Sequence, residues 1–213
     1  MEEKGKRKEE VTAVSGIYGD AEPEMQRTMQ EVLAEIDRFR SMMKEKHGED
    51  PVEHCLARIK SEESMRNKCL ERGLPATPET ALHEIRDAIG IRVVCAFVDD
   101  VMAVLQYLKS IEGYEVVCEK DYIRHAKPNG YRSYHLILRV NGFYVEVQLR
   151  TISMDTWAAL EHQLHYKKNT EGENHLIVRE LKRCADELAS TDVSMQTIRD
   201  MIYSEGVFRE TQA

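Results

Sequence analysis

The sequence predicts an α/β (α+β) fold, with a β-sheet flanked by helices and helical extensions at both ends of the chain. Three observations predict it. Asn141-Gly142 separates two segments of alternating apolar and polar residues, which is typical of a β-hairpin with a two-residue turn. A strand–helix–strand pattern over residues 91–118 leads into that hairpin. Apolar residues at helical spacing recur towards both ends of the 213-residue chain.

The N-terminal part is predicted to be a flexible tail followed by a long helix. Residues 1–22 are charged and then rich in small residues, without apolar periodicity, so we expect a mobile tail. From Pro23 to Met43 apolar residues recur at helical spacing, which predicts a helix within the segment 23–50. We expect this helix to end at His47-Gly48.

Two further helices are expected before the first strand. One covers about residues 51–72 and stops at Gly73-Leu74-Pro75, because glycine followed by proline is a common helix ending. The other begins with Thr77 as its N-cap and Pro78 at its first helical position, and it closes at Gly90.

The strand–helix–strand pattern begins with a buried strand from Ile91 to Phe97. Asp99-Asp100 then caps a helix; a metal pair at these carboxylates is the weaker interpretation, because a helix needs acceptors there. The chain returns as a strand from Tyr114 to Cys118.

The hairpin that follows should present one apolar face and one polar face. A two-residue turn pairs Val140 with Phe143, Leu138 with Val145 and Leu136 with Val147. Because strand side chains alternate, the apolar side chains fall on the core side. The polar face carries His135, Ile137, Arg139, Tyr144, Glu146 and Gln148, with Arg150 beyond them.

After the hairpin the chain is expected to be helical again. One helix covers about 153–167 and a last one about 174–203. We therefore divide the chain into four parts, which are a tail (1–22), an N-terminal helix (23–50), a central domain (51–170) and a C-terminal helical extension (171–213).

Composition limits the classes of function. A net charge of -8 argues mildly against a domain that mainly grips nucleic-acid phosphates, so RNA binding is possible but not supported by charge. The five scattered cysteines form no C-x-x-C pair and indicate reduced thiols. No apolar run approaches 18 residues and no signal peptide is recognisable, so we expect a cytoplasmic protein without a membrane segment.

A row of basic and hydroxyl side chains is the first candidate for phosphate binding. Lys60, Ser64 and Lys68 are four residues apart, so on the predicted helix they share one face, with Arg58 near its start. Ammonium groups in a row could bind a polyphosphate. A solvated face is the alternative, because glutamates are interspersed.

Two carboxylates form the second candidate. Asp87 lies just before a buried strand and Glu146 lies within the hairpin, and neither position favours an acidic residue for structural reasons. Two oxygens brought together from separate strands are suited to Mg²⁺ that also binds substrate phosphates. The alternative is that Asp87 caps a turn and Glu146 pairs with Arg139 or Arg150.

An aromatic ring and an arginine are candidates for contacts with bases. Tyr131 follows Gly130, which allows close approach of the backbone, and its ring could stack on a base. Arg92 interrupts an apolar strand and so must face a pocket or a carboxylate. An ion pair between Arg92 and Asp87 is the structural alternative.

Taken together, these segments resemble the (p)ppGpp synthetase domain of the RelA/SpoT homologue family, and in particular its single-domain small alarmone synthetases. Seven ordered motifs between about Arg58 and Lys167 carry the resemblance. They are R-I-K (58–60), D-A-I-G-I-R-V-V-C (87–95), F-V-D-D (97–100), D-Y-I (121–123), K-P-N-G-Y-R-S-Y-H (127–135), V-E-V-Q-L-R-T (145–151) and W-A-A-L-E-H-Q-L-H-Y-K (157–167).

The resemblance implies a nucleotidyltransferase-like mixed sheet flanked by helices. It also implies a GTP pyrophosphokinase, which transfers the β,γ-pyrophosphate of ATP to the 3′-OH of GDP or GTP in the stringent response. The products would be ppGpp or pppGpp and AMP.

The resemblance also implies roles for individual residues. Arg58 and Arg92 would enclose the adenine, and Lys60, Ser64 and Lys68 would bind the ATP phosphates. Asp87 and Glu146 would bind Mg²⁺ as the cofactor, and we expect Glu146 to activate the 3′-OH. Tyr131 would stack on guanine, and the other acceptor contacts would be Lys120, Lys127, Arg132, His135, Gln148 and Asp155.

Two absences refine the expectation. Long family members carry a hydrolase with a His-Asp dipeptide, and this sequence contains none, so we expect synthesis without hydrolysis. There is also no room for ribosome-sensing domains, so we expect regulation through expression, an allosteric nucleotide or oligomer contacts. Relatives of this size form tetramers through terminal helices, and the segments 23–46 and 174–203 could do so here.

Two other functions remain open from the sequence. A related synthetase could use another acceptor and act as a toxin that forms (p)ppApp or pyrophosphorylates tRNA, although the intact loop 127–135 disfavours this. A non-catalytic regulator that binds RNA or nucleotides is the third possibility, and retention of both carboxylates counts against it.

Overall fold

The centre of the molecule is one five-stranded mixed sheet. The computed structural model describes residues 16–166 and 174–210. Within them the strand order is β1-β2-β5-β4-β3, and β2 and β5 are parallel while the other neighbouring pairs are antiparallel. The strands are β1 (Val52–Ile59), β2 (Ile89–Cys95), β3 (Glu115–Asp121), β4 (Tyr134–Val140) and β5 (Phe143–Thr151).

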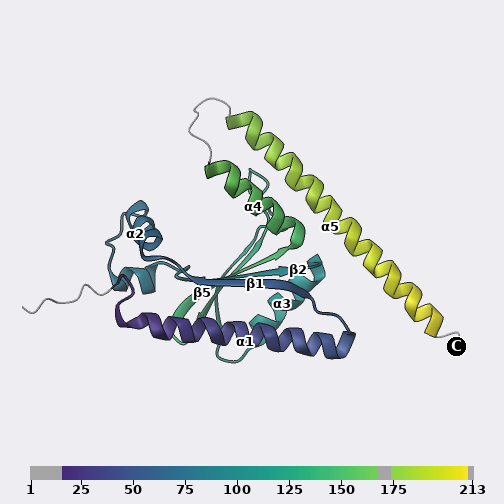
Figure 1. Cartoon of the computed structure of the whole chain (residues 1–213), viewed down its shortest axis with the longest axis horizontal. Coiled ribbons are helices and arrows are strands. Elements are labelled where there is room, and N and C mark those ends of the chain that lie inside the picture. Colours follow the sequence, from purple (N-terminus) through teal and green to yellow (C-terminus); the bar gives the residue numbers. More distant parts are fainter. Residues whose placement is uncertain (1–15, 167–173, 211–213) are drawn as a thin grey trace, which may run out of the picture.

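Helices cover both sides of the sheet (Figure 1). Helices α1 (Glu22–His47) and α3 (Val98–Ser110) pack on one side, while α4 (Ile152–Tyr166) and α5 (Asn174–Glu210) lie on the other. The short helix α2 (Glu62–Glu71) stands at one end of the sheet. The 3₁₀ turn η1 (Gly19–Ala21) precedes α1, and the single π-helical turn η2 (Thr80–Glu84) precedes β2.

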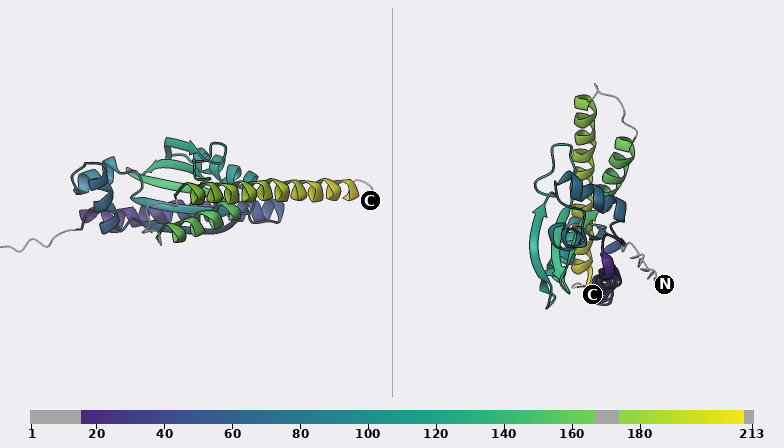
Figure 2. Two further views of the ribbon diagram at one scale, coloured as in Figure 1. Left: turned by 90° about the horizontal axis from the view of Figure 1, so that it is seen from above. Right: turned by 90° about the vertical axis from the view of Figure 1, so that its left-hand side faces the viewer.

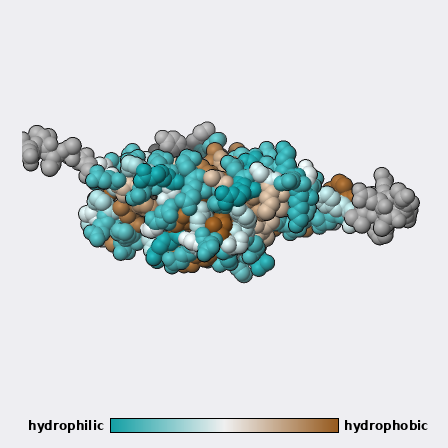
Figure 3. Space-filling model, turned by 90° about the horizontal axis from the view of Figure 1, so that it is seen from below, coloured by the Kyte–Doolittle hydropathy of each residue, from teal (hydrophilic) through white to brown (hydrophobic). Residues whose placement is uncertain are grey.

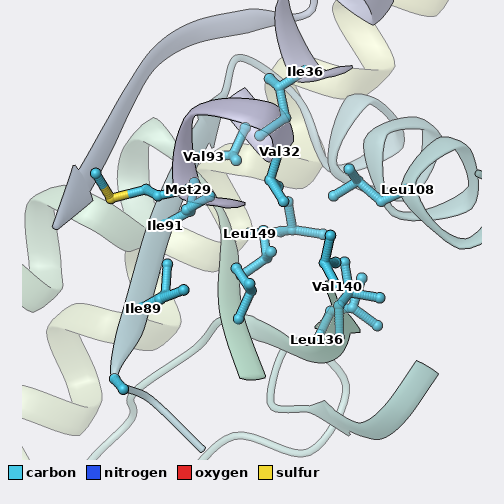
Figure 4. Packing of buried hydrophobic residues seen from close by; sticks show 14 of the residues in the cluster. Met29, Val32, Ile36, Ile89, Ile91, Val93, Leu108, Leu136, Val140 and Leu149 are labelled. Carbon is cyan, nitrogen blue, oxygen red and sulfur yellow. The ribbon is translucent and has the colours of Figure 1, made fainter. Parts of the chain in front are cut away.

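The hydrophobic core lies between the sheet and α1. Met29, Val32 and Ile36 of α1 point towards the side chains of β2, β5 and β4, as Figure 4 shows. Leu108 of α3 closes the same core. Each fully buried Ile, Leu or Met contributes about 1.5–3 kcal/mol, so the helical spacing on α1 accounts for its attachment to the sheet.

The hairpin forms as predicted. Val140 pairs with Phe143, Leu138 with Val145 and Leu136 with Val147. Asn141 and Gly142 both have positive φ, at 51° and 84°, as the two central residues of a type I′ turn require. The apolar face is buried, so the register that the sequence predicts is confirmed.

The helix predicted over residues 51–72 is wrong in its first half. Residues 52–59 form the edge strand β1, and α2 begins only at Glu62. The apolar residues of this strand, Val52, Cys55, Leu56 and Ile59, do have helical spacing, so periodicity alone favours a helix here. Pairing with β2 over seven Cα partners decides the conformation instead, because a non-local ladder outweighs a weak local preference.

The next predicted helix is much shorter than expected. Thr77 does cap it, because its Oγ1 atom accepts a hydrogen bond from the backbone of Thr80 at 3.3 Å. The helical turn nevertheless ends at Glu84, and β2 starts at Ile89 rather than Ile91. Asp87 consequently lies in the tight connection that leads into the strand.

The end of the predicted tail is packed against the domain. Ile17 and Tyr18 are buried, and the Tyr18 hydroxyl donates a hydrogen bond to the carbonyl of Lys60 at 2.6 Å. The expectation that residues 16–22 are mobile is therefore wrong. Burial of two large apolar side chains stabilises this segment by more than the conformational entropy that its ordering costs. Residues 1–15 lie outside the described part.

The remaining helices follow the predictions closely. Asp100 accepts a hydrogen bond from the backbone N–H of Phe97 at 3.2 Å, so it acts as a helix cap as expected. Helix α5 is tied to the domain by Trp157, whose ring N–H donates to the Leu181 carbonyl at 2.9 Å, and by Arg199, which pairs with Asp100 at 3.0 Å. Its C-terminal half projects beyond the sheet (Figure 2).

The face of the molecule seen from below is predominantly hydrophilic, and apolar residues appear on it as scattered patches between hydrophilic ones (Figure 3). None of the helices in residues 16–166 and 174–210 combines the length and apolar character that crossing a membrane requires.

Candidate active site

The sheet face opposite α1 gathers most of the predicted site residues. Arg92 of β2 pairs with Gln148 of β5, and Gln148 pairs with His135 of β4. His135 in turn pairs with Lys120 of the edge strand β3. Because paired residues on neighbouring strands share a face, these four side chains form one row across the sheet.

Asp87 and Glu146 converge on one cavity of about 310 Å³, which we call the first cavity. The parallel register places Gly90 beside Glu146, so the connection that carries Asp87 passes the same end of β5. Arg58, Lys60 and Arg92 line the same cavity. The shared environment that the sequence predicts for the two carboxylates is present.

Two lysines surround Asp87. Lys60 lies 3.0 Å from its Oδ2 atom, and Lys68 contacts the same oxygen. Burial alone would raise the pKa of Asp87, but the hydrogen bonds from Lys68 and Lys60 outweigh it and hold the pKa below its usual value. Asp87 is therefore an anion at neutral pH.

The other oxygen of Asp87 suits a cation. Oδ1 is buried and has no hydrogen-bond partner within the described residues. An orphaned carboxylate oxygen is costly unless a ligand completes it, and a hard divalent cation prefers such oxygens. Asp87 lies close enough for its negative charge to act on Glu146. The pair therefore fits Mg²⁺ that completes its coordination with phosphates.

Glu146 is held by its neighbours on the hairpin. His135 Nδ1 lies 3.2 Å from one oxygen, and the Gln148 amide donates to the other at 2.9 Å. Burial would raise the pKa of Glu146, but the contact with His135 prevails and lowers it. The alternative pairing of Glu146 with Arg139 or Arg150 is wrong, because Arg139 pairs with Glu115 and Arg150 with Asp155.

Arg58 and Arg92 lie on neighbouring strands at the first cavity. Arg92 pairs with Asp155 at 3.3 Å rather than with Asp87, so that structural alternative is also wrong. Leu56 lies beside them and is 55% exposed. Two guanidinium planes and an aliphatic side chain form a surface suited to a purine.

The expected phosphate row changes with the correction to β1. Lys60 directly follows the strand, whereas Ser64 and Lys68 belong to α2, so the three residues do not line one helix. Lys60 and Lys68 still meet at Asp87. Ser64 accepts a hydrogen bond from Ser61 at 2.9 Å at the start of α2.

The predicted acceptor residues cluster around Tyr131. Its hydroxyl lies 2.8 Å from His135 Nε2, and the Lys127 ammonium lies 4.8 Å from the ring centre. Arg132 pairs with Asp186 of α5 at 2.9 Å. Gly130 has φ of +97°, and α5 packs so closely that a Cβ there would lie 2.6 Å from that of Ala185.

Sequence reasoning missed the role of Arg150. This side chain is buried, with the residue 4% exposed, and it donates hydrogen bonds to Asp155, to Gln148 and to the Tyr131 hydroxyl. A buried arginine within V-E-V-Q-L-R-T was a usable signal, because arginine is rarely buried without several partners.

Comparison with known protein families shows which family the chain belongs to. A family model described as the region found in RelA / SpoT proteins matches residues 57–171. The chain belongs to the RelA/SpoT family. The match includes both carboxylates and the whole hairpin.

Curated relatives from Bacillus subtilis (strain 168) support this membership. The chain is 40% identical to GTP pyrophosphokinase YwaC over 161 residues, which are 72% of this chain and 76% of the relative. It is 32% identical to GTP pyrophosphokinase YjbM over 196 residues, which are 87% of each protein.

Solved structures of this family share the fold. The small alarmone synthetase 1 from Bacillus subtilis, bound to its product pppGpp, matches with a TM-score of 0.71 and 28% identity, over 86% of this chain and 99% of that one. A GTP pyrophosphokinase family protein from Streptococcus pneumoniae matches with a TM-score of 0.75 and 32% identity, over 87% and 93%.

Proposed function

We propose that this chain is a GTP pyrophosphokinase. It transfers the β,γ-pyrophosphate of ATP to the 3′-OH of GDP or GTP and thereby forms ppGpp or pppGpp and AMP. The convergence of Asp87 and Glu146 on one cavity, between two arginines and an aromatic cluster, carries this proposal. The names of the relatives support the same reaction.

ATP binds in the first cavity. Arg58 and Arg92 enclose the adenine, and Lys60 and Lys68 direct their ammonium groups to the phosphates. Ser64 at the start of α2 adds a hydroxyl on the same path. The two lysines hold Asp87 in the free protein, so they are already positioned when the phosphates arrive.

Mg²⁺ is held by Asp87 and Glu146. When bound, it neutralises charge on the phosphates that meet the two carboxylates. A cation there would give the buried Oδ1 of Asp87 a partner, and Lys60 and Lys68 would then be free to bind the phosphates.

GDP or GTP binds on the β3–β4 side of the carboxylates. Tyr131 stacks on the guanine, while Lys120, Lys127 and Arg132 bind the 5′-phosphates. His135 and Gln148 position Glu146 through the contacts described above. Asp155 contributes indirectly, because its carboxylate is used by Arg92 and Arg150.

The transfer is a displacement at the β-phosphorus of ATP. The 3′-oxygen of the acceptor forms a new bond to that phosphorus, and the bond to the oxygen that bridges the α- and β-phosphates breaks, so AMP leaves with the bonding electrons. The proton of the 3′-OH passes to Glu146 and then to solvent. Most of the catalytic effect comes from holding the two nucleotides in line.

The assembly and cellular setting are part of the same proposal. Helix α5 exposes apolar side chains, among them Val193, Ile198, Met201 and Ile202, each close to half exposed or more. A homotetramer would cover them, and a nucleotide effector would act at such subunit contacts. We place the protein in the cytoplasm.

A single incubation tests the reaction. The protein is mixed with ATP labelled in the γ-phosphate, Mg²⁺ and either GDP, GTP, ATP or tRNA, and the products are separated by chromatography. Label that moves only onto a guanine nucleotide supports the proposal. Label in a new (p)ppApp product or on tRNA would replace it with another acceptor, and label that stays on ATP throughout would refute a synthetase.

A further inference from the structure

A second cavity of about 370 Å³ adjoins the first and shares Asp87 and Glu146 with it. Four cationic side chains line it, namely Lys68, Arg72, Arg86 and Lys120. Lys68 is already part of the proposed ATP site, and Lys120 belongs to the row across the sheet. Arg72 and Arg86 belong to neither the proposed ATP contacts nor the proposed acceptor contacts.

Arg72 continues the phosphate row of α2. Ser64, Lys68 and Arg72 are four residues apart, so they follow one face of the helix, and each step advances about 6 Å along its axis. The row that the sequence suggested ran from Lys60 to Lys68. In the structure Lys60 lies before α2, and the row continues instead to Arg72, the residue that caps the end of α2 and lines the second cavity.

Arg86 approaches the same cavity from the segment before β2. It directly precedes Asp87, and its guanidinium lies 5.5 Å from the centre of the Tyr144 ring. Contact with an aromatic face restrains a guanidinium without using its N–H groups. The donors of Arg86 therefore remain available for a ligand.

The two arginines lack carboxylate partners. In the described part of the chain, neither Arg72 nor Arg86 has a carboxylate within 4.0 Å, whereas Arg66 on the same helix pairs with Glu62. Unpaired cations gathered at one cavity repel one another, so an anionic ligand would gain energy there. Glu84, Asp87 and Glu146 also line the cavity, so its four cations outnumber its carboxylates by one before any ligand binds.

We propose that Arg72 and Arg86 bind the terminal phosphate of the pyrophosphoryl group that ATP donates. This inference rests on the proposed function. The donor phosphates pass Lys60 and Lys68, so the β-phosphorus lies at the carboxylates and the next phosphate enters the second cavity. Guanidinium groups suit a terminal phosphate, because two N–H donors match two of its oxygens.

This arrangement explains how the group is transferred whole. The bond changes occur at the β-phosphorus, so the terminal phosphate gains and loses no bond during the reaction. Arg72 and Arg86 can hold it throughout, while the 3′-oxygen replaces AMP. They are binding residues for the transferred group and make no contact with the adenine side.

Binding measurements test the proposal without turnover. Arg72→Gln, Arg86→Gln and the double variant are compared with Arg66→Gln, an arginine of α2 paired outside the cavity. With Mg²⁺ present, titration calorimetry should show at least about tenfold weaker binding of a non-hydrolysable ATP analogue for each single variant, and a larger loss for the double variant. The affinity for AMP should stay unchanged in all variants, and Arg66→Gln should bind the ATP analogue as tightly as the wild type does.

Other outcomes separate this inference from the proposed function. Unchanged affinity for the ATP analogue in properly folded variants would overturn the assignment of Arg72 and Arg86 to the donor phosphate. So would variants that lose affinity for GTP but keep their affinity for GDP and for the ATP analogue. That second result would assign the arginines to the acceptor. Wild-type protein that binds the analogue through both arginines yet forms no (p)ppGpp would refute the synthetase and leave this site standing.

Discussion

The Oδ1 atom of Asp155 lies 3.1 Å from Nη1 of Arg150, in an ion pair whose arginine side chain is almost completely buried. The same carboxylate oxygen lies 3.3 Å from Arg92. Arg150 also donates a hydrogen bond to the Tyr131 hydroxyl at 2.6 Å. One buried guanidinium thus connects the arginine expected at adenine with the ring expected at guanine.

Replacement of Arg150 should damage both nucleotide sites together. In Arg150→Met, the Asp155 carboxylate loses its buried partner, and we expect about 3 kcal/mol of destabilisation together with weaker binding of both nucleotides. Arg150→Lys should keep part of the stability but lose the contact with Tyr131. Denaturant unfolding and separate KM values for ATP and GDP measure the two effects.

Arg139→Lys is the matched control for Arg150. It lies on the same hairpin, but its side chain is exposed and pairs with Glu115 at 3.6 Å, so it should alter neither stability nor KM noticeably. A stable Arg150→Met protein with ordinary KM values would contradict the proposed connection.

Glu146→Gln should abolish product formation without unfolding the protein. The amide has nearly the same shape, but it cannot bind a divalent cation as a carboxylate does or accept the 3′-OH proton. We expect a loss of kcat of at least about a thousandfold. Product formation from labelled ATP and circular dichroism are the measurements. Near-normal turnover would refute the role of Glu146.

Gly130→Ala should loosen the contact between the acceptor loop and α5. The new Cβ would lie 2.6 Å from Ala185 Cβ and 3.0 Å from Lys182 Cα, at a φ of +97°. We expect about 2–4 kcal/mol of destabilisation from the clash and the strained backbone. Gly142→Ala meets no atom within 4 Å, so it should cost only about 1 kcal/mol, and equal effects would argue against close packing.

Alkaline pH should destabilise the fold through Cys55. Burial, the largest cause, raises the pKa of this thiol to about 11 from 9.0. Because the folded state favours the neutral thiol, this stability is complete below pH 9 and is lost as pH rises towards 11. Thermal unfolding at pH 8 and pH 10.5 should show a smaller decrease in Tm for Cys55→Ala than for wild type. Identical decreases would contradict it.

The sequence predicted the hairpin in full because its information is local. Asn141-Gly142 restricts the turn, and a period of two then assigns every side chain from Tyr134 to Leu149 to a face. The motif around Glu146 and the acceptor loop could be recognised for the same reason. Each lies within one continuous segment.

The edge strand β1 shows where local information failed. Its apolar residues have helical spacing, yet Cys55, Ala57 and Ile59 face the core, while Leu56 and Arg58 face the first cavity. That arrangement depends on pairing with β2, whose residues lie thirty or more positions further along the sequence. The same error placed Lys60 on a helix with Ser64 and Lys68.

By itself, the sequence determined the family, the hairpin, the long terminal helices and the identity of the two carboxylates, because motifs and periodicity are properties of neighbouring residues. Tertiary structure alone decided that Arg92 pairs with Asp155, that Arg150 joins both sides of the site, and that Arg72 reaches the second cavity. These facts depend on strand register and helix placement, which are set by contacts between distant segments that no local pattern encodes.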